Sequence, residues 1–387
     1  MASIQLHAAA WRDAILVLAA FPLVYYVLAA LAALRFFLAE RARPMASFTP
    51  PVSILKPVHG VDFGSFENFS SFCRQDYPDY EILFAVNDES DPAIPVIRSV
   101  ISRFPGRKIR VLSGAPRLGA NQKVNNLALL ARDAHHDFLV LSDGDVRVGP
   151  HYLREVVAPL ADPAVAAVTS FYRAVAQPDF WAELEAVGAA GDFFAGVLMA
   201  AATEGIHFAL GASVATTRQW LAKIGGFESF PDHLADDYEL GNRLSRSGGR
   251  VLLSREPVWT MYPSQTWSAF WQHQLRWART IRLCRPLSYF GLLLTQGLPW
   301  ALLAAVVAPS PVVAGAYLGS YLLLRTATAW IVGVWGVKDE VLGRRIWLLP
   351  LRDAFYFATW LASFASNRII WSGAKYKIQK GQMIPVH

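Results

Sequence analysis

The stretch FLVLSDGDVRV, residues 138–148, decides the fold. Its first four residues form a short apolar run, which is typical of a buried β-strand, and the run ends at Asp143, Gly144 and Asp145. Because ligands of open α/β sheets bind beyond the carboxyl ends of the strands, the two carboxylates lie where a site is expected. Two hard oxygen ligands one residue apart suit a divalent cation that holds a diphosphate. For an isolated motif, an ordinary Asp-Gly turn is the alternative interpretation.

Strand and helix patterns alternate along the chain around this stretch. We expect strands at 52–57, 80–86, 109–112 and 165–171, and helices at 66–72, 94–104 and 121–132. This alternation predicts an α/β, Rossmann-like fold with a mostly parallel sheet and right-handed crossovers. The second strand runs into Asp88, so a further carboxylate is expected near the same edge of the sheet.

The composition is that of a membrane protein, with 54% hydrophobic and 17% charged residues and 13 tryptophans among 387. The apolar stretch from Ala14 to Leu38 is long enough to cross a bilayer and too long for a cleaved signal peptide, so residues 1–43 are expected to form an uncleaved anchor. Arg35 lies near the end of this stretch and Arg41 and Arg43 follow it, whereas Arg12 alone precedes it, and this bias predicts that residues 44–265 are cytoplasmic. The net charge of +6 is spread beside apolar segments, so we expect the lipid bilayer as a partner and no nucleic acid.

Residues 266–287 are predicted to form an interfacial amphipathic helix. Aromatic residues recur at helical spacing from Trp267 to Trp271, and arginines recur at every third position from Arg276 to Arg285. Aromatic rings suit the headgroup level of a membrane, and guanidiniums suit the phosphates of a lipid or a nucleotide. A basic helix packed on a soluble domain is the alternative.

Residues 288–370 are predicted to contain the C-terminal membrane helices. Two apolar stretches, 290–308 and 312–337, are separated by Pro-Ser-Pro and are expected to form an antiparallel hairpin of spanning helices. A third stretch, 346–370, contains Arg352 and Asp353, so it either spans or forms a re-entrant or tilted helix that begins after Asp353. Residues 371–387 are expected to be a basic tail. The two cysteines have no metal-ligand spacing, which indicates neither a disulfide framework nor a zinc site.

Two further segments have two interpretations each. Residues 180–202 are apolar, but their longest charge-free run, 193–203, is too short to span a bilayer. We expect either an interfacial or acceptor-lining helix there, or an ordinary core helix. The acids Asp236, Asp237 and Glu239 open a predicted helix, where the helix dipole alone could explain them.

Taken in this order, the motifs resemble the processive-type inverting glycosyltransferases of the nucleotide-diphospho-sugar fold. Within that group, the chain is similar to the ceramide glucosyltransferase family and to the related bacterial hopanoid glycosyltransferases. The similarity covers about Val52 to Pro286, and the anchor before it and the apolar helices after it agree with the family's layout. Each motif is weak alone and specific in this order.

The resemblance implies how the nucleotide sugar is bound. Asp88 matches the aspartate that contacts the nucleotide base, and Lys123, within NQKVNN, matches the lysine beside the nucleotide. Asp143 and Asp145 match the D-x-D site for the metal, Mg²⁺ or Mn²⁺, and for the diphosphate. Arg276 matches the arginine of the family's (Q/R)xxRW signature, which also contacts the donor.

The resemblance also implies the remaining catalytic and acceptor residues. Asp237 matches the catalytic base, and Trp277 ends the signature. One position departs from the family, because His273 stands where Gln or Arg is usual; a histidine can still donate a hydrogen bond to a diphosphate or to an acceptor hydroxyl. The acceptor pocket is expected to contain Gly211, Asp236 and Trp271.

The implied activity is transfer of a sugar, glucose in the first instance, from a UDP-sugar to a hydroxyl of a membrane lipid with inversion. Ceramide is the first expected acceptor, and a hopanoid lipid with UDP-N-acetylglucosamine is the alternative, toward which His273 and the stretches 71–78 and 233–237 point. A polysaccharide synthase is a further alternative, but more helices would be needed to form its pore. The expected location is a bacterial inner membrane, with the catalytic domain in the cytoplasm.

Overall fold

The computed structural model describes residues 2–42, 47–371 and 374–386. These residues form two compact units, which we call the sheet unit and the helical unit. The sheet unit consists of Ala39–Gln177, Glu204–Pro263 and Trp371–His387, and the helical unit consists of Met1–Leu38, Pro178–Thr203 and Ser264–Ile370.

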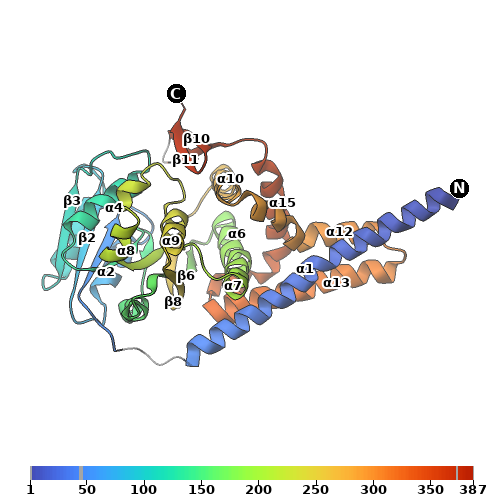
Figure 1. Cartoon of the computed structure of the whole chain (residues 1–387), viewed down its shortest axis with the longest axis horizontal. Coiled ribbons are helices and arrows are strands. Elements are labelled where there is room, and N and C mark those ends of the chain that lie inside the picture. The colour runs from blue at the N-terminus through green and yellow to red at the C-terminus, as the bar shows by residue number, and fades with distance from the viewer. Residues whose placement is uncertain (1, 43–46, 372–373, 387) are drawn as a thin grey trace. The chain divides into compact units, whose positions relative to one another are not determined.

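The sheet unit is built on eight strands in the order β3-β2-β1-β4-β7-β6-β8-β5. Four of them, β2, β3, β6 and β8, are labelled in Figure 1. Their bounds are β1 Val52–Pro57, β2 Tyr80–Val86, β3 Lys108–Ser113, β4 Phe138–Ser142, β5 Val146–Arg147, β6 Val165–Ala176, β7 Ser213–Thr217 and β8 Arg250–Tyr262. The pairs β1–β2, β2–β3, β1–β4 and β6–β8 are parallel. Strand β7 is antiparallel to β4 and β6, and β5 is antiparallel to β8. The predicted α/β fold with a mostly parallel sheet is therefore confirmed, with antiparallel pairs confined to β5 and β7.

Helices connect these strands as the alternation of patterns predicted. They are α2 Ser65–Cys73, α3 Ala93–Arg103, α4 Gln122–Asp133, α5 Tyr152–Val157, η1 Ala158–Ala161, α8 Arg218–Lys223, η3 Phe227–Ser229 and α9 Asp236–Arg246. Helix α4 packs against β1 and β2. Its first turn is fixed by Asn121, whose side chain accepts a hydrogen bond from the backbone N–H of Val124 at 3.2 Å.

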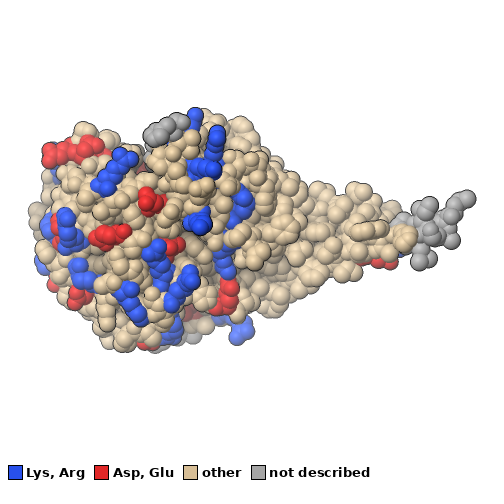
Figure 2. Space-filling model, turned by 45° about the horizontal axis from the view of Figure 1, so that its top comes forward, with Lys and Arg blue, Asp and Glu red and all other residues tan. Residues whose placement is uncertain are grey.

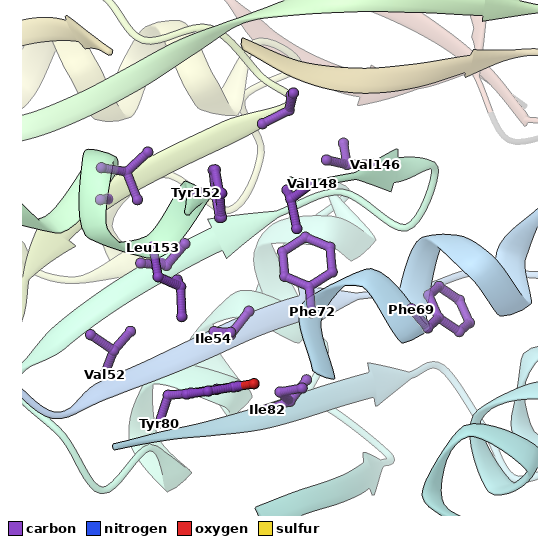
Figure 3. Close-up of a cluster of buried hydrophobic side chains, with 14 of the residues drawn as sticks. Val52, Ile54, Phe69, Phe72, Tyr80, Ile82, Val146, Val148, Tyr152 and Leu153 are labelled. Atoms are coloured by element: carbon purple, nitrogen blue, oxygen red, sulfur yellow. The ribbon is translucent and has the colours of Figure 1, made fainter. Parts of the chain in front are cut away.

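The central strands β1 and β2 are buried along their whole length, because helices cover both faces of this part of the sheet. Figure 3 shows one face, where Val52 and Ile54 of β1 lie beside side chains of β2, α2 and α5. Among them, the rings of Phe72 and Tyr152 meet edge to face at 6.0 Å. Each fully buried side chain of this size contributes about 1.5–3 kcal/mol. This packing makes the carboxyl ends of β1 and β4 a rigid support.

The helical unit contains most of α1 (Ala2–Ala42) and the helices between residues 178 and 370 that lie outside the sheet unit. These are α6 Phe180–Gly188, η2 Ala189–Phe193, α7 Phe194–Thr203, α10 Trp267–Cys284, α11 Pro286–Gly291, η4 Leu292–Thr295, α12 Gly297–Val307, α13 Pro311–Ala329, η5 Trp330–Val337, α14 Glu340–Arg345, η6 Ile346–Leu348 and α15 Leu349–Ser363. On the face shown in Figure 2, charged side chains are almost absent where α12 and α13 run in Figure 1.

Two helical segments among the described residues are long and apolar enough to cross a membrane: Ala9–Arg41, with a mean hydropathy of 2.4, and Phe180–Thr203, with 1.5. The second was not expected, because its charge-free run is short; the helix continues through Asp192, which lengthens the span. Pro286–Thr295 and Gly297–Val307 pass the same test together but are bent by 49° at their junction. The first expected arm of the hairpin, 290–308, therefore falls in this bent pair of helices, and α13, in the second arm, falls below the test among the described helices.

Helix α15 begins at Leu349, so the suggested start after Asp353 is wrong. Asp353 and Arg325 form a buried ion pair instead: Nη2 of Arg325 lies 2.8 Å from Oδ1 of Asp353. Tyr321 donates its hydroxyl to the same carboxylate at 2.9 Å, and Nη1 of Arg325 donates to the carbonyl of Gly191 at 2.6 Å. The charges within the apolar segments thus satisfy one another, as an apolar environment requires.

Residues 374–386, within the expected basic tail, form a β-hairpin. They contribute β10 (Ala374–Gln379) and β11 (Gln382–Pro385) to a second sheet of order β11-β10-β9, in which β9 is Arg368–Trp371. Ile378 and Met383 face each other across the β10–β11 hairpin and are both buried.

Candidate active site

A pocket lies at the carboxyl ends of β1 and β4 in the sheet unit. It is lined by Pro57, Lys123, Leu127, Leu141, Ser142, Asp143, Gly211, Val214, Phe227, Phe230, Asp236, Asp237 and Leu240. Five of these residues were predicted as site residues from the sequence: Lys123, Asp143, Gly211, Asp236 and Asp237. They come from four separate segments of the chain, which the sheet and its connections bring to one edge.

Lys123 holds two of the carboxylates together. Its Nζ lies 2.6 Å from Oδ1 of Asp143 and 3.3 Å from Oδ2 of Asp236. Burial lowers the pKa of Lys123, but Asp143, Asp236 and Asp237 outweigh that effect and raise the pKa above its ordinary value. The ammonium therefore remains charged, and it is placed beside an Asp143 side chain that is 31% exposed.

Asp237 differs from its neighbour Asp236 in its surroundings. Asp236 is paired with Lys123, whereas Asp237 lies against Gly211: a Cβ added to that glycine would lie 3.0 Å from Oδ2 of Asp237. Burial raises the pKa of Asp237 to about 6, and the charge of Asp236 adds to the shift, while Lys123 opposes it. A carboxylate with a pKa near neutrality suits a general base.

A buried lysine lies beneath the Asp143-Gly144-Asp145 turn, and we did not predict it. Nζ of Lys56 donates to the carbonyl of Asp143 at 2.7 Å and lies 3.8 Å from the centre of the Phe72 ring. Burial lowers the pKa of Lys56 to about 7 against the opposing charges of Asp143 and Asp145. The signal in the sequence is a lysine next to the end of a buried strand whose other residues, apart from Ser53, are apolar.

Asp143 and Asp145 are suitable ligands for a divalent cation. Burial raises the pKa of Asp145 to about 7, and the charges of Asp143 and Asp62 add to this, while Lys56 opposes it. A cation would relieve that repulsion. No group of three or more His, Cys, Asp and Glu side chains is arranged as a metal site within the described part of the chain. Two carboxylates are nevertheless sufficient for Mg²⁺ when substrate phosphates complete its coordination.

The loop before Asp236 is held on two sides. On one side, the backbone N–H of Ala120 donates to the Asp232 carboxylate at 2.8 Å, and Asn121 donates its N–H to the carbonyl of Pro231 at 2.8 Å. On the other side, the N–H of Met383 in the C-terminal hairpin donates to the carbonyl of Asp232 at 2.7 Å. The sequence does not indicate this contact, because it joins the backbones of Asp232 and Met383, which are 151 positions apart.

Asp88 lies apart from this pocket. It follows β2 in an exposed turn, and its carboxylate accepts hydrogen bonds from the N–H of Ser90, at 2.8 Å, and from the Ser90 hydroxyl. These bonds lower the pKa of Asp88. Its position near the carboxyl edge agrees with the expected one, but Asp88 does not line the pocket.

The other predicted site residues belong to the helical unit and lie on α10. The rings of His273 and Trp277 are 5.1 Å apart, and the Trp271 ring lies 5.3 Å from that of Trp267. Burial lowers the pKa of Arg276, and Glu185 opposes the shift. Two members of the arginine series contact protein carbonyls: Nη1 of Arg279 donates to Arg368, and Nη2 of Arg282 donates to Ser366.

The sheet order and the acidic edge define the class: the fold is of the GT-A type found in glycosyltransferases. A mannosyltransferase from Pyrobaculum calidifontis, solved in complex with GDP-Man and Mn²⁺, has a similar structure, with a TM-score of 0.51. The alignment covers 90% of this chain and 99% of the mannosyltransferase at 18% identity, so the likeness concerns the fold.

The chain belongs to glycosyl transferase family 21, whose sequence model matches residues 14–384. Ceramide glucosyltransferase 1 of Caenorhabditis elegans is 28% identical over 231 residues, which are 59% of this chain and 49% of the relative. The ceramide glucosyltransferase of Komagataella phaffii is 33% identical over 116 residues, 29% of this chain and 23% of the relative. The chain thus matches half or less of these relatives' length. The family predicted from the motifs is confirmed.

Proposed function

We propose that the protein transfers glucose from UDP-glucose to a hydroxyl of a membrane lipid, with ceramide as the first candidate, and inverts the anomeric carbon. The observation that carries this proposal is the pocket in which Lys123 joins Asp143 to Asp236 while Asp237 lies beside Gly211. A single displacement needs a positive charge that stabilises the leaving diphosphate and a base that takes the proton of the acceptor hydroxyl. Lys123 provides the first, and Asp237, with its raised pKa, provides the second.

Asp237 acts as the general base in this proposal. Its carboxylate takes the proton from the acceptor hydroxyl while that oxygen forms a bond to the anomeric carbon. The bond between the anomeric carbon and the diphosphate oxygen breaks on the opposite face, which inverts the configuration. Asp236 is unsuited to this role because its carboxylate is paired with Lys123.

Charge that develops on the departing UDP is stabilised by the ammonium of Lys123, which lies 2.6 Å from Asp143. Asp143 and Asp145 would hold Mg²⁺ or Mn²⁺, which supplies further positive charge to the diphosphate when it is bound. From the family resemblance we assign Arg276 to the same task and Asp88 to the nucleotide base.

The proposed acceptor is a lipid because the described residues include two candidate spans and a third, bent one, nearly all of them in the helical unit. A hydroxyl at headgroup depth is accessible to an enzyme anchored in the bilayer. The excess of arginine after the first span favours a cytoplasmic catalytic domain. From the resemblance to the bacterial branch we assign the protein to a bacterial inner membrane.

The test is mass spectrometry of the lipids made by membranes that contain the protein. Membranes are given UDP-glucose or UDP-N-acetylglucosamine, each with ceramide or with a hopanoid polyol. We expect glucosylceramide as the main product. If only a glycosylated hopanoid forms, the acceptor is a hopanoid and not ceramide. If only a water-soluble oligosaccharide grows, transfer of the sugar to a lipid is contradicted altogether.

A further inference from the structure

One backbone N–H of the C-terminal hairpin points away from its own partner strand. The N–H of Val386 donates to the carbonyl of Lys375 at 3.0 Å, so these two residues form a hydrogen-bonded pair of the β10–β11 ladder. Hydrogen-bonded and non-hydrogen-bonded pairs alternate along an antiparallel ladder. Met383 is paired with Ile378 and, counted along β11 from Val386, belongs to a non-hydrogen-bonded pair. The N–H and the carbonyl of Met383 are therefore turned away from β10.

The outward edge of β11 binds residues 231–235, and all of these residues belong to the sheet unit. Met383 donates its N–H to the carbonyl of Asp232 at 2.7 Å, and Leu234 donates its N–H to the carbonyl of Gly381 at 3.3 Å. The two segments run antiparallel where these bonds form. The hairpin thus supports residues 231–235 as a neighbouring strand would.

The opposite side of residues 231–235 is held by the segment that leads into α4. Asn121 donates its backbone N–H to the carbonyl of Pro231 at 2.8 Å and its side-chain Nδ2–H to the carbonyl of His233 at 2.7 Å. The two backbones are in close contact, because a Cβ added to Gly119 would lie 2.7 Å from the carbonyl oxygen of Pro231. Residues 231–235 are therefore clamped between the start of α4 and the hairpin.

The clamped residues connect two that line the pocket, Phe230 and Asp236. They belong to none of the helices and strands that the structure describes, so the hydrogen bonds on their two sides fix their position. Helix α9 begins at Asp236. A shift of residues 231–235 would consequently move Asp236 and Asp237 together.

We propose that Met383 is a positioning residue for the reaction, which acts through the backbone of residues 231–235. Its bond to this segment keeps Asp236 at 3.3 Å from Lys123 and, with it, keeps Asp237 in the pocket. This inference rests on the proposed function. Because a rate depends steeply on the placement of the reacting groups, loss of the bond lowers kcat although every group that contacts the substrate remains.

The test compares Met383→Pro with Met383→Ala in the full-length protein in membranes. Proline removes the N–H that binds Asp232 but no hydrogen bond within the hairpin, and β11 already contains Pro385 at an equivalent outward position. Alanine removes the buried side chain and keeps the N–H. The rate is divided by the number of sites that bind labelled UDP-glucose, which removes the contribution of any unfolded protein.

We expect kcat per binding site to fall by about tenfold in Met383→Pro and to stay within about threefold of wild type in Met383→Ala. The KM for UDP-glucose should stay within about threefold in both variants, because Lys123 and Asp143 are unchanged. A merely structural role of Met383 would reduce the number of binding sites and leave the rate per site as it is.

A second pair of variants applies if Met383→Pro does not fold. Gly381 has a φ of 80°, and its carbonyl accepts the N–H of Leu234, so Gly381→Ala strains the turn that carries this acceptor. We expect it to lower kcat by about three- to tenfold. Gly248→Ala is the matched control in the same unit, because Gly248 has a φ of 89° and a Cβ there meets nothing within 4 Å.

A wild-type kcat in Met383→Pro would overturn the inference and leave the proposed function standing. So would equal losses in Met383→Pro and Met383→Ala, which would assign the effect to the buried side chain, or equal losses in Gly381→Ala and Gly248→Ala. A loss in Met383→Pro that appears only as fewer binding sites would overturn it as well. Wild-type protein that transfers no sugar from any UDP-sugar would overturn the proposed function itself.

Discussion

Two clusters of charged side chains, one in each unit, differ in how completely their charges are paired within the protein. In the helical unit, Arg325 is 3% exposed and donates to Asp353 and to the carbonyl of Gly191. In the sheet unit, Lys123 is 25% exposed and bridges Asp143 and Asp236, while Asp237 beside them has a raised pKa. The first cluster is closed by its own partners, and the second remains partly open to solvent and to a ligand.

The difference separates stability from activity. A closed cluster in an apolar environment stabilises one arrangement of the helices, and removing one partner leaves an uncompensated buried charge. A partly open cluster keeps acids and a cation available for a substrate, and its perturbed pKa values are typical of functional sites. Substitutions in the two clusters should therefore affect different measurements.

The largest effect on activity is expected for Asp237→Asn. The substitution preserves the size of the side chain but removes the base, so we expect kcat to fall by about 10²–10⁴-fold. Binding of UDP-glucose, measured by calorimetry on the same purified protein, should survive. Asp162→Asn is the control, because Asp162 pairs with Arg250 on the surface of the sheet unit. A variant that keeps more than about a tenth of the wild-type rate would exclude Asp237 as the base.

Chelation is expected to have the next largest effect. EDTA should remove activity and Mg²⁺ or Mn²⁺ should restore it, because Asp143 and Asp145 are hard oxygen ligands at the strand end. Asp145→Ala should not be restored by either ion. Full activity after exhaustive chelation would instead indicate that Lys123 and Arg276 are sufficient for the leaving group.

Arg325→Met tests the closed cluster. The substitution leaves Asp353 buried without its cation and should lower the free energy of unfolding by about 3–5 kcal/mol. Thermal unfolding in detergent measures the loss, and the double variant Arg325→Met, Asp353→Leu should recover part of it. The same measurement on Asp237→Asn should show little change. If Arg325→Met and Asp237→Asn lowered the free energy of unfolding by similar amounts, the distinction between the two clusters would be lost.

The sequence predicted the fold and much of the pocket because both depend on local patterns. Strand β2 was predicted with the bounds that the structure shows, and β1 likewise, since apolar runs bounded by polar residues identify buried strands. Asp143 follows β4 directly, and β4 pairs in parallel with β1, so this acid lies at the carboxyl edge of the sheet. Lys123 and Asp237 were predicted from the family resemblance. Each lies in the first turn of a helix, and no local pattern distinguishes it from an ordinary residue at a helix start.

What the sequence did not predict depends on contacts between distant residues. The support of the Asp232 backbone by Met383, and the pairing of Arg325 with Asp353, follow from tertiary packing alone. The second candidate span, Phe180–Thr203, was missed for a related reason. Its acid Asp192 interrupts the apolar run, but Arg325 lies 3.9 Å from that carboxylate.

The pH dependence of kcat should report the raised pKa of Asp237. The base is active only when it is deprotonated, so kcat should fall about tenfold per pH unit below pH 6 and reach a plateau above it. The charged groups that influence this carboxyl are Asp236, Lys123 and Asp143. Measuring UDP-glucose binding over the same range separates the base from the donor site. A kcat that stays constant down to pH 4.5 would contradict the assignment.

The smallest effect is expected for Gly211→Ala, which tests how closely the base must be placed. The added Cβ would lie 3.0 Å from Oδ2 and 3.5 Å from Cγ of Asp237, so the carboxylate must move by a few tenths of an ångström. Because the position of a reacting group affects the rate steeply, we expect kcat to fall by about three- to tenfold, with the KM for UDP-glucose unchanged. Gly106→Ala is the matched control in the same unit, since a Cβ there meets nothing within 4 Å. If Gly211→Ala raised only the KM for the lipid, Gly211 would define acceptor space and leave the base undisturbed.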